Sequence, residues 1–176
     1  MEKTSTEPLK EDDIKILTEL HYNAKENIEK LAKRCGFSTQ KVRRTIKQLE
    51  DRRIIWGYSA ITDTMKMNQK QFILCIKRNN KPLENKTIEK ISNINLENLF
   101  RPLDLHIVCT YFVHGTFDWL IVCTGEDLRQ ARKLCDILYT EFSGLIEHID
   151  IQQILHTHRK QYIFNPDQKR LRDLLK

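Results

Sequence analysis

Residues 38–53 combine side chains that can hydrogen-bond bases with side chains that can pair with phosphates. Val42, Ile46 and Leu49 recur at i, i+4 and i+7, so they are predicted to share the buried face of one helix. The opposite face carries polar and cationic side chains: Gln40, Lys41, Arg43, Arg44 and Lys47. Gln and Arg can contact base edges in DNA, whereas Lys and Arg pair with phosphates. Because a cationic helix face is also common as plain solvated surface, the neighbouring elements must decide between the two interpretations.

The elements around this helix predict a unit of three helices. Ser38 suits the N-cap, since its hydroxyl can accept a hydrogen bond from the first helical turn. A shorter helix is predicted to follow Asn27 and to end at Gly36, which can take the left-handed backbone conformation that closes a helix. Another amphipathic helix is predicted from about residue 9 to residue 22. Two helices joined by a short turn form a helix-turn-helix, whose second helix enters the major groove, so the pattern predicts a DNA-binding module.

The second half of the chain predicts an α+β domain. Strands and helices are expected in the order strand, helix, strand, strand, helix, strand, over residues 71–77, 86–96, 105–113, 117–124, 126–142 and 146–155. This is the order of the ferredoxin-like βαββαβ unit, in which both helices cover one face of an antiparallel sheet. The hairpin strands are apolar on both faces, yet the helices can cover only one of them. A second copy of the same sheet is expected on the open face, which predicts a homodimer or an assembly of dimers.

Four segments resemble the leucine-responsive regulator/AsnC (feast/famine) family of prokaryotic transcription factors. They are residues 9–17 (LKEDDIKIL), 31–38 (LAKRCGFS), 54–63 (IIWGYSAITD) and 113–122 (VHGTFDWLIV). The third is similar to the strand that leaves the family's DNA-binding domain, and the fourth to its Gly-x-x-Asp hairpin, with Gly115 and Asp118 at the matching positions. The resemblance spans roughly residues 9–160. It implies a winged-type helix-turn-helix domain followed by a ferredoxin-like effector and oligomerisation domain, that is, a sequence-specific transcriptional regulator.

The sequence departs from the family pattern at three positions that bear on binding rather than on fold. The family usually has an Arg where Thr45 stands, a Gly near Arg52, and a Thr where His114 stands.

The predicted DNA contacts divide into two groups. Gln40, Arg43 and Arg44 are the predicted base readers, with Ser38 and Thr39 at the start of the helix. The predicted phosphate contacts are Lys41, Lys47, Arg52 and Arg53. A two-fold dimer would present two such helices, so the preferred operator is expected to be palindromic double-stranded DNA.

The resemblance also implies a small effector, an amino acid held near the Gly-x-x-Asp hairpin. Carried onto this chain, it nominates His114, Gly115, Thr116 and Asp118. A simpler interpretation is that Gly115 serves the turn and Asp118 caps it.

The predicted domain boundaries follow from these patterns. Residues 1–8 are expected to be a polar tail, 9–63 the helix-turn-helix domain with its exit strand, 64–70 a hinge and 71–160 the ligand-sensing and dimerisation domain. Residues 161–176 are expected to form a helical extension, with Asn165 as its cap and Pro166 in its first turn.

Composition narrows the class of protein. The formal net charge of +6 favours an anionic partner. No apolar run approaches the ~20 residues that cross a bilayer, and the N-terminus has no signal-peptide core, so a cytoplasmic protein without a membrane partner is expected.

The five cysteines lack Cys-x-x-Cys spacing, which indicates reduced thiols rather than disulfides. His156 and His158 could form a metal-ligand pair on a strand, but ordinary surface histidines explain them as well, and neither a metal nor a cofactor is predicted.

Two other classes of function stay open at this stage. Haem-precursor decarboxylases share the two-domain architecture, but their His-Asn-Tyr-x-Arg segment is missing from residues 106–115 and no nucleophile with a neighbouring base is evident, so no enzyme is predicted. A pure interaction module would carry the basic helix only for solubility. It would show no salt-dependent binding to DNA.

Overall fold

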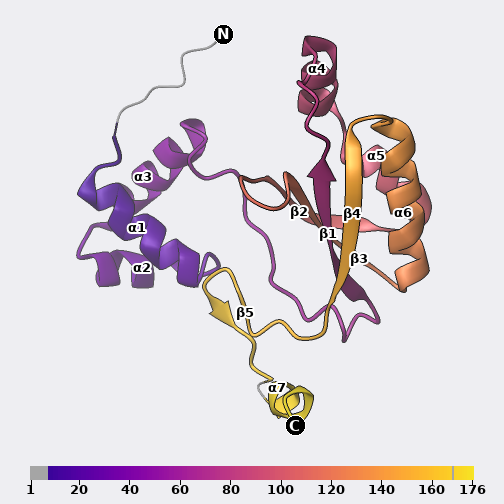
Figure 1. Ribbon diagram of the computed structural model, residues 1–176. Helices are drawn as coiled ribbons and strands as arrows, with labels where there is room; N and C mark the ends of the chain where they lie inside the picture. Colours follow the sequence, from indigo (N-terminus) through magenta and orange to yellow (C-terminus); the bar gives the residue numbers. More distant parts are fainter. Residues whose placement is uncertain (1–7, 168) are drawn as a thin grey trace. The chain divides into compact units, whose positions relative to one another are not determined.

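The computed structural model describes residues 8–167 and 169–176, so residues 1–7 of the predicted N-terminal tail lie outside the described part (Figure 1). The described chain forms two compact units. The first contains residues 8–61, 157–167 and 169–176, and the second contains residues 62–156. The chain therefore leaves the first unit, forms the second, and returns to the first.

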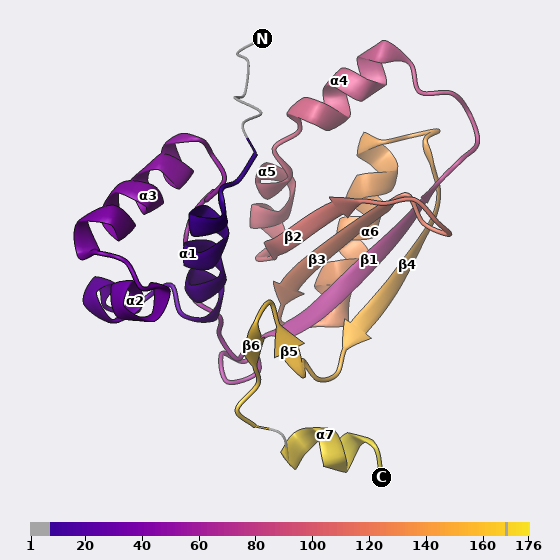
Figure 2. The ribbon, with the colours of Figure 1, turned by 90° about the vertical axis from the view of Figure 1, so that its left-hand side faces the viewer.

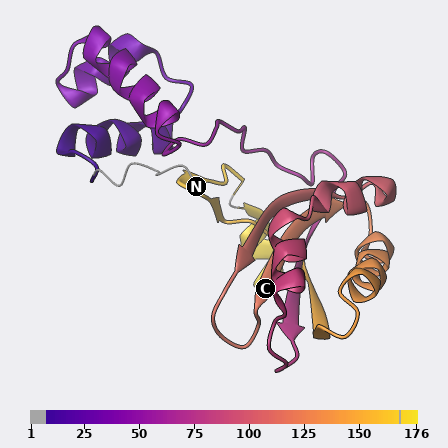
Figure 3. The ribbon, with the colours of Figure 1, turned by 90° about the horizontal axis from the view of Figure 1, so that it is seen from above.

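The first unit is built on the three predicted helices, α1 (Glu11–Tyr22), α2 (Ile28–Cys35) and α3 (Thr39–Asp51), which form one compact group (Figure 3). The predicted helix ends are confirmed. The Asn27 side chain accepts from the Glu29 N–H at 2.7 Å, and Gly36 closes α2 with φ of 73°. The small core contains apolar side chains from all three helices: Ile16, Leu31, Ala32, Cys35 and Val42.

The predicted exit strand after α3 is wrong for this structure. Residues 54–63 form no strand, and within the described part of the chain no other strand lies beside them to supply backbone hydrogen bonds. Trp56 is 95% exposed, and Tyr58 is more than half exposed. An extended segment without a hydrogen-bonding neighbour is not a strand, however strong its β propensity.

The second unit has the predicted α+β fold. Its sheet contains β1 (Lys70–Arg78), β2 (His106–Phe112), β3 (Trp119–Gly125) and β4 (Ile146–Ile154), in the order β2-β3-β1-β4 with every pair antiparallel. The helices α4 (Asn85–Asn93), α5 (Leu96–Phe100) and α6 (Leu128–Glu141), with a short 3₁₀ turn at Arg101–Leu103, complete the unit. Figure 2 looks onto the face of the sheet that α6 leaves free.

The main core lies between the sheet and α5 and α6. Its largest fully buried side chains include Phe72, Leu74 and Ile121 from the sheet and Leu134 and Leu138 from α6. The helix predicted over residues 86–96 is corrected to two helices, because Ile94 is extended (φ −68°, ψ 127°) and ends α4. This break redirects the chain so that Leu96 and Phe100 of α5 can enter the core.

The open face of the sheet is less apolar than alternation alone predicts. A register shift between Ile107 and Cys109 of β2 puts these two residues on opposite faces, whereas simple alternation places them together. On the open face, Ile73 pairs with Val122 and Cys75 with Leu120. These four side chains form an apolar strip at the centre of the face, and all except Cys75 are only half-buried.

The C-terminal extension is only partly helical. Arg159–Lys160 (β5) and Ile163–Phe164 (β6) form a two-stranded hairpin, and α7 covers Lys169–Leu174. Asn165 precedes this helix, and its side-chain amide donates to the Thr157 carbonyl while its Oδ1 accepts from the Asp167 N–H. The hairpin belongs to the first unit, where the Tyr162 ring stacks on His21 of α1 at 4.5 Å.

None of the five cysteines forms a disulfide. Burial raises the thiol pKa of Cys123 to about 12 and that of Cys135 to about 11, so both stay protonated at neutral pH and are poor nucleophiles. The helices in the described part of the chain are all too short or too polar to span a membrane.

Candidate nucleic-acid interface

Helix α3 is fixed in its domain by a cap and a buried face. The Ser38 hydroxyl accepts from the Lys41 N–H at 3.2 Å, as predicted for the N-cap. Val42 and Leu49 are fully buried, and between them the third buried position is Thr45, with Ile46 only half-buried beside the core. Thr45 therefore points inward and cannot take the place of the Arg that the family pattern has there.

The predicted base readers lie on the opposite side of α3. Thr39, Gln40, Arg43, Arg44 and Lys47 are all exposed. Within residues 8–167 and 169–176, neither Arg43, Arg44 nor Lys47 forms an ion pair. Cations that form no ion pair within the described part of the chain are available for an anionic partner.

Two of the predicted phosphate contacts have partners inside the domain. The Lys41 ammonium group lies 2.6 Å from the Asp12 carboxylate and 3.9 Å from the centre of the Phe37 ring. The Arg52 guanidinium lies 3.6 Å from the carboxylate of Asp13. Asp13 is 8% exposed and also accepts from the Lys10 N–H at the start of α1, so these contacts join α1 to both ends of α3.

Arg53 occupies the backbone conformation that ends α3. Its φ is 56°, in the left-handed region, and the next two N–H groups, of Ile54 and Ile55, both donate to the Leu49 carbonyl. A non-glycine residue in this conformation costs roughly 1 kcal/mol. This is the place where the family pattern has a Gly nearby, so the chain retains an exposed cation here at the expense of backbone strain.

Replacing Ser38 by Ala is expected to destabilise α3 by about 1 kcal/mol, because the first-turn N–H loses its acceptor. Native-state hydrogen exchange of the α3 amides would measure the change in local opening free energy. Ser59→Ala, in the exposed segment after α3, is the matched control and should leave these amides unchanged. Equal exchange in both variants would contradict the capping role.

Of the four predicted effector residues, Asp118 is hydrogen-bonded within the domain, whereas the other three are exposed. The Asp118 carboxylate accepts from the Arg78 N–H at 2.9 Å and lies 3.3 Å from the Lys77 ammonium group, at the end of β1. These contacts hold the pKa of Asp118 below its usual range. His114, Gly115 and Thr116 are exposed in the connection between β2 and β3, and Gly115 has φ of 151°. Asp118 therefore contacts β1, while the other three residues face solvent.

Replacing Asp118 by Asn is expected to destabilise the hairpin by at most about 1 kcal/mol at pH 7, because the group is partly solvated. A depressed folded-state pKa stabilises the fold above the unfolded pKa of about 4, and this contribution is lost as the pH falls through the folded value. The stability difference between the variant and the native chain should therefore shrink as the pH falls from 5 to 2. Urea unfolding across this range would measure it, with exposed Asp136→Asn on α6 as control. A difference that does not change with pH would rule out the ionic contribution.

Within the described residues, no group of three or more His, Cys, Asp and Glu side chains is placed to hold a metal ion. His156 and His158 lie beyond the end of β4, and the ring of His158 packs edge-on against Phe164.

Comparison with known proteins agrees with this geometry. An AsnC-type helix-turn-helix domain is matched over residues 9–50, which spans α1, α2 and almost all of α3. No curated protein sequence matches the chain.

Solved structures share the fold of most of the chain. A feast or famine regulatory protein from M. tuberculosis, complexed with L-methionine, has 20% sequence identity and a TM-score of 0.68, covering 90% of this chain and 100% of its own. An AsnC family transcriptional regulator from Agrobacterium tumefaciens has 20% identity and a TM-score of 0.64, covering 90% and 98%. A transcriptional regulator from Neisseria meningitidis, in complex with L-Met, has 20% identity and a TM-score of 0.63, covering 91% and 98%.

An AsnC-type helix-turn-helix domain thus precedes an antiparallel α+β domain, and the two together have the fold of these solved structures. The helix-turn-helix of this chain is therefore of the AsnC type.

Proposed function

We propose that this regulator reads a palindromic operator through α3, as a homodimer or an assembly of dimers. The main support for DNA binding through α3 is that the cations on and beside this helix fall into two groups. Lys41 and Arg52 are held by acidic neighbours, whereas Arg43, Arg44 and Lys47 are exposed without an ion pair in the described structure.

Gln40, Arg43 and Arg44 are assigned to base edges, with Thr39 beside them at the start of the helix. Arg suits the O6 and N7 acceptors of guanine, and Gln suits the N6 and N7 groups of adenine. Lys47 and Arg53 are assigned to phosphates, and the strain retained at Arg53 supports a role outside folding. Lys41 and Arg52 are assigned mainly to fixing α3 against α1.

The dimer is proposed to form through the open face of the sheet. The strip of Ile73, Cys75, Leu120 and Val122 is apolar, and α5 and α6 pack on the other face. An apolar strip on an antiparallel sheet is stabilised when a second sheet covers it. Two copies related by a two-fold axis would present two α3 helices to successive major grooves.

Two of the solved structures described above contain methionine, which supports an amino acid as the effector class of this chain as well. The hairpin tip of His114, Gly115 and Thr116, next to Asp118, is the proposed contact. No catalytic role is proposed, and the regulator is expected to act in the cytoplasm on chromosomal DNA.

Selection of bound sequences from a random duplex pool tests this proposal. Enrichment of a palindrome, bound more weakly as salt is raised, is the expected result, because each phosphate contact releases counterions on binding. Binding without an enriched motif would leave only non-specific attraction and would favour the interaction-module alternative.

A further inference from the structure

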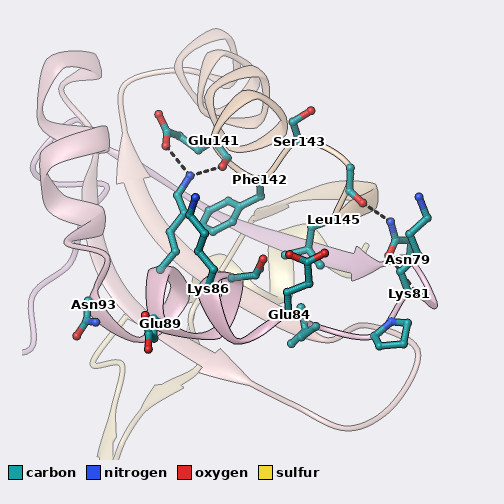
Figure 4. Close-up of a pocket in the computed structure, with 15 residues that line it drawn as sticks. Asn79, Lys81, Glu84, Lys86, Glu89, Asn93, Glu141, Phe142, Ser143 and Leu145 are labelled. Atoms are coloured by element: carbon teal, nitrogen blue, oxygen red, sulfur yellow. Dashed lines mark hydrogen bonds and ion pairs between the residues drawn. The ribbon is translucent and has the colours of Figure 1, made fainter.

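The second unit contains a cavity whose lining residues have no role in the proposed DNA or hairpin contacts. It has a volume of about 730 Å³ and lies between the loop after β1, helix α4 and the turn after α6 (Figure 4). Volumes of roughly 300–1,000 Å³ are typical of sites for small organic ligands. The hairpin residues nominated for the effector do not line it.

The floor and the far wall of this cavity are firmly held. Phe142 is 4% exposed and belongs to the core, and Leu145 packs against the same core. The Asn79 N–H donates to the Leu145 carbonyl at 2.9 Å, and the Asn79 side-chain amide donates to the Gly144 carbonyl. The cavity therefore has an apolar floor that does not depend on a ligand for its shape.

The remaining wall, α4, is held lightly. None of its residues is buried. Within the described residues, its side-chain hydrogen bonds to other elements come from Lys90, whose ammonium group donates to the Glu141 carbonyl at 2.5 Å and to the Glu141 carboxylate at 3.2 Å. A helix with few buried contacts can move away from and back onto a ligand at low cost.

The charges around the cavity are balanced in number. Three lysines (Lys81, Lys86 and Lys90) face three glutamates (Glu84, Glu89 and Glu141) among the lining residues. Lys90 and Glu141 pair with each other, whereas Lys81, Lys86, Glu84 and Glu89 form no ion pair in the described part of the chain. A lining of zero net charge disfavours polyanions such as nucleotides. It suits a ligand that carries one charge of each sign at its two ends.

We propose that this cavity binds a short zwitterionic peptide with apolar side chains. The carboxylate end would meet Lys86 or Lys81, the ammonium end would meet Glu84 or Glu89, and the side chains would lie on Phe142 and Leu145. A single amino acid would leave most of the volume filled by water, whereas a dipeptide or tripeptide would fill more of it and could reach a lysine and a glutamate of the lining at the same time. This site is separate from the proposed hairpin contact and does not depend on DNA binding.

Isothermal titration calorimetry of the full chain with L-leucyl-L-leucine tests the proposal. We expect saturable binding that weakens at least tenfold for the N-acetylated dipeptide and for the dipeptide amide, each of which lacks one terminal charge. Free L-leucine is expected to bind at least tenfold more weakly than the dipeptide. Ligand addition should also slow hydrogen exchange of the amides of residues 85–93.

Matched variants locate the site. Lys86→Met is expected to weaken dipeptide binding at least tenfold, whereas Lys133→Met, on the exposed face of α6 away from the cavity, should leave it unchanged. Both lysines are exposed, so neither change threatens the fold. The proposal is overturned by the absence of dipeptide binding, by equal affinity for L-leucine, or by dipeptide binding that survives Lys86→Met. None of these outcomes affects the operator selection, so the two proposals can fail separately.

Discussion

Replacing Arg44 by Ala is expected to weaken binding to the selected operator by about 1–3 kcal/mol, which is roughly a 5- to 150-fold rise in Kd. The reason is that Arg44 projects from the exposed face of α3 and forms no ion pair in the described structure, so its guanidinium is available for a guanine. Discrimination at one operator position should relax at the same time, because a lost base contact removes preference there. Fluorescence anisotropy with the operator and with single-base variants of it would measure both effects.

Arg34→Ala is the matched control for this measurement. Arg34 lies in α2 of the same domain, and its guanidinium contacts the carboxylates of Glu19 at 2.5 Å and Glu26 at 3.0 Å. The hydrogen bonds that Arg34 donates to Glu26 and Glu19 raise its pKa, as expected for a group already engaged within the protein. Arg34→Ala should leave the ranking of operator variants unchanged. If Arg44→Ala also left both affinity and ranking unchanged, Arg44 would be removed from the base readers.

The helix-turn-helix could be predicted closely from the sequence because its signals are local. A capping hydroxyl at Ser38, a capping amide at Asn27 and a left-handed glycine at Gly36 each act within a few residues of their partners, so spacing alone locates the helix ends. The order of the second domain was predictable for a similar reason, since each strand and helix carries its own apolar period.

Features that depend on distant neighbours were not predictable in this way. The ion pair between Lys41 and Asp12 joins α3 to α1, and no local pattern distinguishes Lys41 from the free cations beside it. The register shift near Cys109 depends on how β2 meets β3, and it reverses the face on which Ile107 lies. The stacking of Tyr162 on His21 joins positions near opposite ends of the chain, which hydrophobic periodicity does not report.

The open face of the sheet offers a second substitution with a large expected effect. Leu120 pairs with Cys75 in the register of β1 and β3, at the centre of the apolar strip. Leu120→Asp is expected to destabilise the dimer by at least about 3 kcal/mol, because association would bury an unpaired carboxylate in each copy. Sedimentation velocity should show monomers at concentrations where the native chain is dimeric.

Leu128→Asp provides the control for this substitution. Leu128 is the first residue of α6, on the opposite side of the sheet, and is 38% exposed. An acidic residue in the first turn of a helix is favourable. This variant should stay dimeric. Because two half-sites are read together only by a dimer, Leu120→Asp should also reduce operator affinity steeply while α3 keeps its own structure. A folded Leu120→Asp protein that remained dimeric would show that the two copies meet elsewhere, and the open face would then have to be assigned to a different partner.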